Sequence, residues 1–417
     1  MIKRSRNRPW LIALVSHFLL MTLNGYAQDT LLSHPMLVPD SSVTEGKEFM
    51  FTAQTKGVFY SNGIGSRWLR DWARGGEISR SSNEKQLSKL PAKSSAMGIW
   101  STLLDIQAPL FADSISDSDV ENRIGIQVGQ YEVFRGSYDP QIFQLLFLGN
   151  KGLDGKSLVG RNNELEVFQY RSIGINWSHA NFKQLTFCDF GINWVESSQY
   201  TRWAVPRYEI NFAPGMQNVA LDYVAKRQSL DDGRKGIGFS TQMAWEELQG
   251  PLHWFVRVQD LGWIKYRDLQ ADRWKGEGTY SGFNTQTLQN ADSLSNFLTP
   301  YAVHNSRSVD RWVALPCSLN VGFVFRDKWA YSLNYYFGGQ WGHQSIGRLW
   351  SVEKGKQVFR FRVDALRSLQ NQWGLQGSIH WINYRGLNIA VVGSNWLRTA
   401  AGDASFFSGR LMLNMAF

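Results

Sequence analysis

Residues 410–417, Arg-Leu-Met-Leu-Asn-Met-Ala-Phe, alternate strictly in their side chains. One parity is apolar and consists of Leu411, Leu413, Met415 and Phe417, whereas the other is mixed. Successive side chains of a β-strand point to opposite faces, so this stretch predicts a strand with one apolar face. A soluble sheet can show the same alternation. A strand that closes an outer-membrane barrel also explains the terminal aromatic, because lipid-facing bands end in aromatic girdles. We therefore interpret these four residues as an assembly signal.

The other end of the chain predicts export. Four basic residues come first: Lys3, Arg4, Arg6 and Arg8. An apolar stretch over 10–23 follows, and Gly25 and Ala27 supply small residues for a signal peptidase. This predicts a signal peptide over 1–27, cleaved after Ala27, and a single barrel domain over 28–417. A membrane anchor is the alternative, but a spanning helix needs about 20 apolar residues.

Composition points the same way. Aromatic residues make up 14% of the 417 residues, with 18 Trp, yet 19% of residues are charged and the mean hydropathy is −0.30. A barrel gives half of each strand to lipid and half to a polar lumen, which combines many aromatics with low hydropathy. After residue 27, no apolar run is long enough for a spanning helix. A soluble sandwich or propeller is the rival, but no blade-length repeat is present.

Alternating segments recur along the chain between turns rich in Gly, Asn, Asp and Ser. The clearest is 357–364, where Phe361 and Val363 oppose Arg362 and Asp364. The other strong segments are 185–195, 235–245, 252–259, 318–326, 373–382, 386–397 and the terminal strand. Weaker candidates lie at 47–55, 96–106, 122–134, 165–178, 208–225 and 329–337. Together they predict an all-β fold, a transmembrane antiparallel barrel of about 14 strands.

Two segments interrupt the strand pattern. In 62–90, Trp68, Leu69 and Trp72 fall at helical spacing, and Ser81 with Glu84 forms a capping-box pair for a second helix. Asp139 and Pro140 begin another helix. Such backbone must avoid lipid, so we expect short internal or periplasmic helices, with 62–90 as a cap or plug.

The segment 255–264, Phe-Val-Arg-Val-Gln-Asp-Leu-Gly-Trp-Ile, resembles the "DLG" strand of an uncharacterised family of Bacteroidetes outer-membrane barrels. The paired Gly75 and Gly76 and the turns near Asn150 and Lys156 also resemble this family. The family is related in architecture to fatty-acid transporters and to accessory barrels of type IX secretion. The resemblance implies a 14-stranded barrel with internal helices and implies no specific activity.

The same segment predicts a β-bulge. Before Asp260 the apolar parity is even, whereas Leu261 begins an odd apolar parity, and a bulge produces such a shift of face. Gly262 suits a strained backbone. The bulge either opens the wall sideways or only fits the curvature of the barrel.

Arginines at inward positions are the main candidates for solute contact. Arg257, Arg360 and Arg362 lie opposite apolar residues, so they are expected to face the lumen. They form either a positive stripe that selects anions or a network that braces the wall. On this assignment Phe361→Arg is costly and Arg362→Gln is mild. The other candidates for ligand binding are Trp68, Leu69 and Trp72 of the helical segment 62–90.

No catalytic motif is present: the chain lacks HExxH, GxSxG, a P-loop and CxxC. We expect no enzyme activity, no cofactor and no metal. Cys188 and Cys317 are favoured as thiols, with a disulfide as the alternative. The expected function is transport of a small hydrophobic or amphipathic solute across the outer membrane. The alternative is an accessory or scaffolding barrel with secretion or surface-protein partners. Outer-membrane lipid and the barrel assembly machinery are the expected partners in either case, and nucleic acid is not.

Overall fold

The computed structural model describes most of the chain, in separate ranges. These are residues 49–65, 68, 78–110, 120–148, 152–181, 183–216, 218–231, 233–280, 302–325, 328–337, 341–355, 357–369, 373–383, 387–395 and 406–416. The predicted signal peptide lies outside them, as do Leu69, Trp72 and Phe417. No helix in the described ranges is long and apolar enough to cross a membrane.

Strands dominate the described chain, with two short helices, α3 (Arg80–Leu87) and α4 (Pro140–Leu148). The strands are β1 (Met50–Ser61), β2 (Ser94–Pro109), β3 (Val120–Tyr138), β4 (Ser157–Asn181), β5 (Thr186–Phe212), β6 (Val219–Ser229), β7 (Gly236–Gln249), β8 (Leu252–Tyr280), β9 (Ala302–Ala314), β10 (Ser318–Phe325), β11 (Trp329–Tyr336), β12 (Trp341–Lys354), β13 (Gln357–Ser368), β14 (Trp373–Asn383), β15 (Leu387–Ser394) and β16 (Phe406–Ala416).

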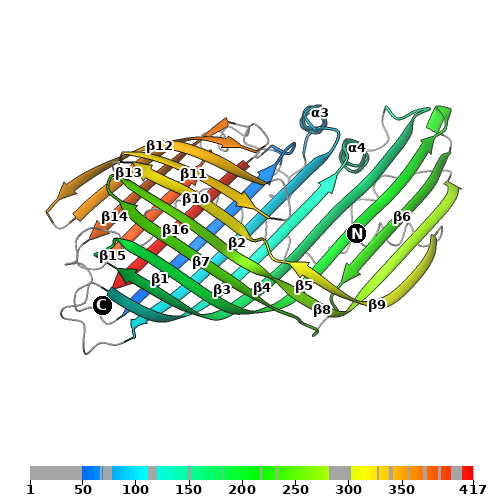
Figure 1. Ribbon diagram of the computed structural model, residues 1–417. Helices are drawn as coiled ribbons and strands as arrows, with labels where there is room; N and C mark the ends of the chain where they lie inside the picture. Colours follow the sequence, from blue (N-terminus) through cyan, green and yellow to red (C-terminus); the bar gives the residue numbers. More distant parts are fainter. Residues whose placement is uncertain are drawn as a thin grey trace, which may run out of the picture.

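These strands form one antiparallel sheet that closes on itself (Figure 1). Closure comes from β16, which pairs with β1 from Ala416 opposite Met50 to Phe406 opposite Tyr60. β5 pairs with β7 along its first half and with β6 along its second half, so β6 and β7 share one place in the wall. β9 and β10 share another place beside β8. The 16 strands therefore make a closed barrel of 14 wall positions, which confirms the predicted fold class.

Strand alternation separates an apolar outer face from a polar inner face. On β13, Phe361 and Val363 are exposed, whereas Arg362 and Asp364 are buried. Large apolar side chains are exposed at the same level on neighbouring strands: Ile126, Ile175, Trp177, Ile192, Trp194, Phe239, Trp263, Ile346, Trp350 and Ile379. An apolar belt around a closed barrel is the surface that a membrane covers. The chain is therefore a transmembrane β-barrel.

The two ends of the barrel differ in their connections. We call the end at which β1 begins and β16 ends the lower end. Its connections are short apart from 110–119; they are 182–185, 250–251, 326–328, 355–356 and 384–386. The opposite, upper end has the connections 62–93, 139–156, 213–218, 281–301, 337–340, 369–372 and 395–405. Outer-membrane barrels have short periplasmic turns and longer extracellular loops. Both helices therefore lie at the upper end, which corresponds to the extracellular side.

One side of the wall extends beyond the apolar belt. We call this part, made of β6, β9 and the adjoining halves of β4, β5 and β8, the projecting sheet; β6 and β9 lie at the right of Figure 1. On its outer face the belt ends at Trp194 and Trp263. Exposed ion pairs follow, Lys235 with Glu196 at 2.7 Å and Lys265 with Asp310 at 3.5 Å. Charged pairs directly beyond aromatic residues mark the upper edge of the belt.

The outer face of the projecting sheet is covered by α4. Ile142 and Leu145 of α4 pack against a cluster that contains Tyr208, Tyr223 and Trp274. Leu269 points into the barrel, and the strand pairing from Leu269 to Trp274 is regular. Trp274 lies five residues further along, an odd separation, so it points outward. Asp139 caps α4 through Ile142 N–H at 2.8 Å and accepts a hydrogen bond from the Tyr208 hydroxyl at 2.6 Å. This helix therefore lies outside the lumen.

Candidate functional site

Hydrogen-bonded polar side chains fill the lower lumen, the part of the interior toward the lower end of the barrel. Arg362 and Asp364 are both nearly fully buried, with Nη2 and Oδ1 2.7 Å apart. Gln376 donates to the other Asp364 oxygen at 3.3 Å. Arg360 shares this face by strand parity and is half-buried. Of the two interpretations of these arginines, bracing of the wall therefore fits Arg362.

A small polar cavity of about 90 Å³ is lined by other polar side chains of the barrel. Its lining includes Asp105, Asn176, Arg257 and Arg410. Asn176 donates to both Asp105 oxygens at 3.1 Å. Arg257 pairs with the buried Glu246 at 3.1 Å. Ligand pockets usually enclose about 300–1,000 Å³, so this space suits a few water molecules and no organic solute in this state.

The wall bulges at Asp260, where the face of β8 changes. Thr241 of β7 lies opposite Leu261 and Met243 lies opposite Val258, so Gln242 faces both Gln259 and Asp260. Leu261 and Trp263 are exposed on the lipid side, and Ile264 is buried inside. The left-handed φ of 55° belongs to Asp260. Gly262 has a different role, because a Cβ there would lie 2.0 Å from the Phe239 carbonyl oxygen of β7.

An apolar cluster fills the lumen directly above the bulge, and we call it the inner aromatic cluster. Its buried members are Tyr131, Val133, Phe168, Tyr170, Val195, Tyr200, Ile264, Tyr266, Leu269, Val313 and Leu315. Tyr131 stacks on Tyr170 with ring centroids 4.4 Å apart, and Tyr200 lies 4.5 Å from Tyr266. The Tyr266 hydroxyl donates to Ser197 Oγ at 2.7 Å. This cluster was not predicted from the sequence, although its β3 and β4 members are alternate residues of one parity.

The wall is discontinuous beside this cluster. Residues 315–317 separate β9 from β10, opposite Asp260, Leu261 and Gly262. Leu315 N–H donates to the Gly262 carbonyl at 3.0 Å, and Phe337 N–H donates to the Cys317 carbonyl at 2.8 Å. Within the described ranges β9 pairs only with β8. We call residues 315–317, at which the pairing with β11 ends and β9 continues beside β8 alone in the described wall, the seam.

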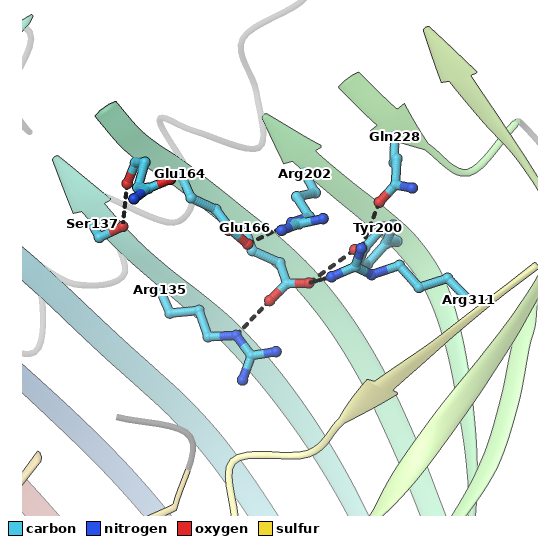
Figure 2. Close-up of polar contacts among 9 residues, drawn as sticks. Arg135, Ser137, Glu164, Glu166, Tyr200, Arg202, Gln228 and Arg311 are labelled. Atoms are coloured by element: carbon cyan, nitrogen blue, oxygen red, sulfur yellow. Dashed lines mark hydrogen bonds and ion pairs between the residues drawn. The ribbon is translucent and has the colours of Figure 1, made fainter. Parts of the chain in front are cut away.

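An ion network lies on the inner face above the inner aromatic cluster (Figure 2). Glu166 of β4 is nearly fully buried; it is paired with Arg135 of β3 and accepts from the Tyr200 hydroxyl at 2.9 Å. Arg311 of β9 lies 3.7 Å from the same carboxylate and donates to Gln228 at 2.8 Å. This network connects β9, the strand at the seam, to strands on the other side of β8.

Arg202 and Glu164 form the outermost pair of this network, with Nη2 and Oε2 2.7 Å apart. Arg135, Arg202 and Arg311 each keep about a quarter of the side chain exposed. Three arginines and two glutamates leave the network with one excess positive charge. The inner surface therefore changes from apolar to cationic at this level.

Trp68 belongs to the cap formed by α3 and α4. Its indole N–H donates to Asn83 Oδ1 at 2.7 Å, and its ring lies 5.2 Å from Phe143 and 4.8 Å from Phe147. α3 begins after Ser79, which accepts from Ser82 N–H, so the predicted cap at Ser81 is wrong by two residues. The described part of 62–90 is therefore packed onto α4 and not inside the lumen.

The structure also describes most residues of the predicted assembly signal and both cysteines. Leu411, Leu413 and Met415 are half-buried on the outer face of β16, opposite the buried Arg410, Met412 and Asn414. Cys188 and Cys317 are both free, and Cys317 lies in the seam and not within a strand. The described ranges contain no group of three or more His, Cys, Asp or Glu side chains arranged to hold a metal ion.

Comparisons with solved structures find similarity to outer-membrane barrels. No protein-family model matches the chain, and no curated protein sequence matches it. Among solved structures, the Pseudomonas putida toluene transporter TodX aligns with a TM-score of 0.40 and 9% identity, over 94% of this chain and 93% of that one. A Pseudomonas aeruginosa FadL homologue gives 0.36 and 10%, over 94% and 98%.

The transport unit of the Escherichia coli autotransporter AIDA-I gives a TM-score of 0.31 and 7% identity, over 99% of both chains. Similarities at this level carry no information on function. The Bacteroidetes family resemblance remains a prediction. The closed barrel, its apolar belt and its asymmetric ends are those of an outer-membrane β-barrel.

Proposed function

We propose that this protein transports a small hydrophobic or amphipathic solute across the outer membrane, from the mouth of the barrel to the seam. The observation that carries the proposal is the position of the inner aromatic cluster, which lies inside the lumen beside residues 315–317, where the described strand pairing passes from β9 to β10.

An apolar cluster suits an apolar solute. The lumen of a general porin is polar and water-filled, whereas sites for organic ligands are mostly apolar with a few polar groups. Here the tyrosines of the cluster supply hydroxyl groups, and the arginines of the ion network lie directly above them. An amphipathic molecule that enters from the mouth therefore contacts the cationic surface first and the apolar surface next.

The seam offers the exit. The lower lumen is closed by buried hydrogen-bonded pairs such as Arg362 and Asp364, so a straight passage toward the lower end requires breaking this network. Leu315, which is part of the seam, is buried in the cluster. Movement of β9 away from β11 therefore connects the cluster with the membrane. We propose this sideways movement as the transport step.

Two substitutions on one strand test the proposal. Val309 of β9 packs against the inner aromatic cluster, and Val303 is on the same face by parity but 68% exposed. Val309→Trp fills the route and should reduce uptake of N-phenyl-1-naphthylamine by expressing cells to the level of cells without the protein. Val303→Trp, the matched control, should leave uptake unchanged. Equal uptake by both variants and the unmodified protein contradicts the route.

A scaffolding function is the second candidate. The closed polar network of the lower lumen and the exposed edge of β9 favour it, because a free edge strand can accept a partner strand. If cells that express the unmodified protein take up no more dye than control cells, while an affinity-tagged form isolates secretion or surface proteins, this alternative replaces transport.

A further inference from the structure

A group of cations without ion-pair partners covers the inner face of the projecting sheet. Its members are Lys226 on β6, Arg273 and Lys275 on β8, and Arg307 on β9. All four are exposed. Among the residues that the structure describes, none of the four has an ion pair or a side-chain hydrogen bond. We call these four residues the cationic patch.

Strand register places them together on one face. Lys226 lies directly opposite Arg273, so their Cβ atoms are about 4.5–5.5 Å apart. Lys275 is two residues along β8 from Arg273 and shares its face. Arg307 of β9 is opposite Ala271, which precedes Arg273 by two residues on the same face of β8, so Arg307 and Arg273 are diagonal neighbours. The patch therefore spans three neighbouring strands, about 10 Å at the usual strand spacing.

The patch faces the interior of the barrel. Leu269 is a buried member of the inner aromatic cluster, and Arg273 and Lys275 are four and six residues further along regularly paired β8. An even separation keeps the same face. Trp274, which has the other parity, is buried on the outer face. The four cations thus lie above the ion network of Figure 2, at the mouth of the barrel.

Nearby carboxylates have other partners. Glu164 pairs with Arg202, Glu166 pairs with Arg135, and Asp222 pairs with Arg207 at 3.3 Å. Glu277 remains two residues beyond Lys275 on the same face and forms no described ion pair. Like charges directly opposite on neighbouring strands are destabilising. One carboxylate facing four cations leaves most of this repulsion uncompensated.

We propose that the cationic patch is a binding site for a soluble anion that carries two or more phosphate groups. Lysine and arginine are the side chains that bind phosphate oxygens through charge-assisted hydrogen bonds. A single phosphate is too small to contact cations on three strands, whereas linked phosphates can. The inner face is turned away from the lipid belt, so the ligand comes from solution and not from a headgroup of the surrounding membrane. This site does not depend on the seam or on transport.

Purified protein in a neutral detergent tests the site with sodium tripolyphosphate as the probe and inorganic phosphate as the comparison. Calorimetry at low ionic strength should show tripolyphosphate binding that weakens as salt is added. The variant Lys226→Gln/Arg273→Gln should bind about tenfold or more weakly, since each lost charged hydrogen bond alone accounts for about this factor. Inorganic phosphate should bind weakly to all forms.

The matched control is Lys183→Gln/Lys354→Gln, which removes two exposed charges at the lower end of the barrel. It should bind the probe as the unmodified protein does. Without probe, the patch variant should unfold at a higher temperature than the unmodified protein, because a directly opposed pair of like charges is gone. Equal probe binding by patch variant and control, no binding to the unmodified protein at low salt, or a lower unfolding temperature of the patch variant overturns the proposal.

Discussion

At the scale of single residues, alternation assigns faces well but does not reveal partners. Phe361 is exposed to lipid and Arg362 is buried in the lumen, as the sequence predicts. However, the sequence predicts a mild effect of Arg362→Gln, as for a solvated lumen residue. The structure changes this expectation, because Arg362 is the direct partner of the buried Asp364.

Arg362→Gln should therefore cost about 3–5 kcal/mol, the cost of leaving a buried charge without its partner. Phe361→Arg should cost about 2–4 kcal/mol because it places a charge in lipid. Urea unfolding in lipid vesicles measures both. The double variant Arg362→Gln/Asp364→Asn removes both charges and should recover much of the loss; a double variant less stable than Arg362→Gln contradicts the pairing.

At the scale of elements, the sequence identifies strands within the membrane better than strands beyond it. No strand is predicted between Tyr266 and the segment 318–326, because charges such as Arg273 and Lys275 break the apolar alternation. In the structure β8 continues to Tyr280, since both charges lie on the inner, water-facing side of the projecting sheet, whereas Trp274 between them is buried on the outer face. Likewise 208–225 reads as one strand, whereas a turn at Pro214–Met216, with Gly215 at a φ of 76°, separates β5 from β6.

The bulge in β8 supports a prediction at this scale. Deleting Asp260 removes the extra residue, so Leu261 and Trp263 are driven toward the lumen and Ile264 toward lipid, because a one-residue slip inverts every later side chain. The deletion should strongly reduce the heat-modifiable folded band on gels. Asp260→Gly keeps the chain length and permits the φ of 55°, so it should assemble. A deletion that assembles as well as Asp260→Gly argues against the bulge.

The cap supports another prediction. Trp68→Ala removes the ring that joins α3 to Phe143 and Phe147 of α4. A buried aromatic truncation costs about 3–5 kcal/mol locally, enough to loosen a cap that covers the outer face of the projecting sheet. Limited proteolysis should cut within 62–90 faster, while the barrel keeps its heat-modifiable migration. Unchanged cleavage shows that Trp68 does not hold the cap.

At the scale of the whole molecule, the closed barrel of 14 positions is predictable because alternation repeats along the chain. The seam and the inner aromatic cluster are not. Both depend on which distant strands meet: Tyr131 and Tyr170 come from neighbouring strands, but Val313 and Leu315 join them only after the wall has curved. The break at 315–317 also lacks a distinctive sequence, since Pro316 alone marks an edge or a bulge as readily as a seam.

The proposed transport function requires that the barrel passes apolar solutes and not polar ones. Proteoliposomes provide the direct measurement, with swelling in arabinose as the assay for a water-filled channel and uptake of N-phenyl-1-naphthylamine into protein-containing outer membranes as the assay for an apolar route. The account predicts no arabinose swelling above that of protein-free liposomes, because the lower lumen is closed, and dye uptake that depends on the protein. Rapid arabinose swelling, or dye uptake no faster than in membranes without the protein, contradicts it.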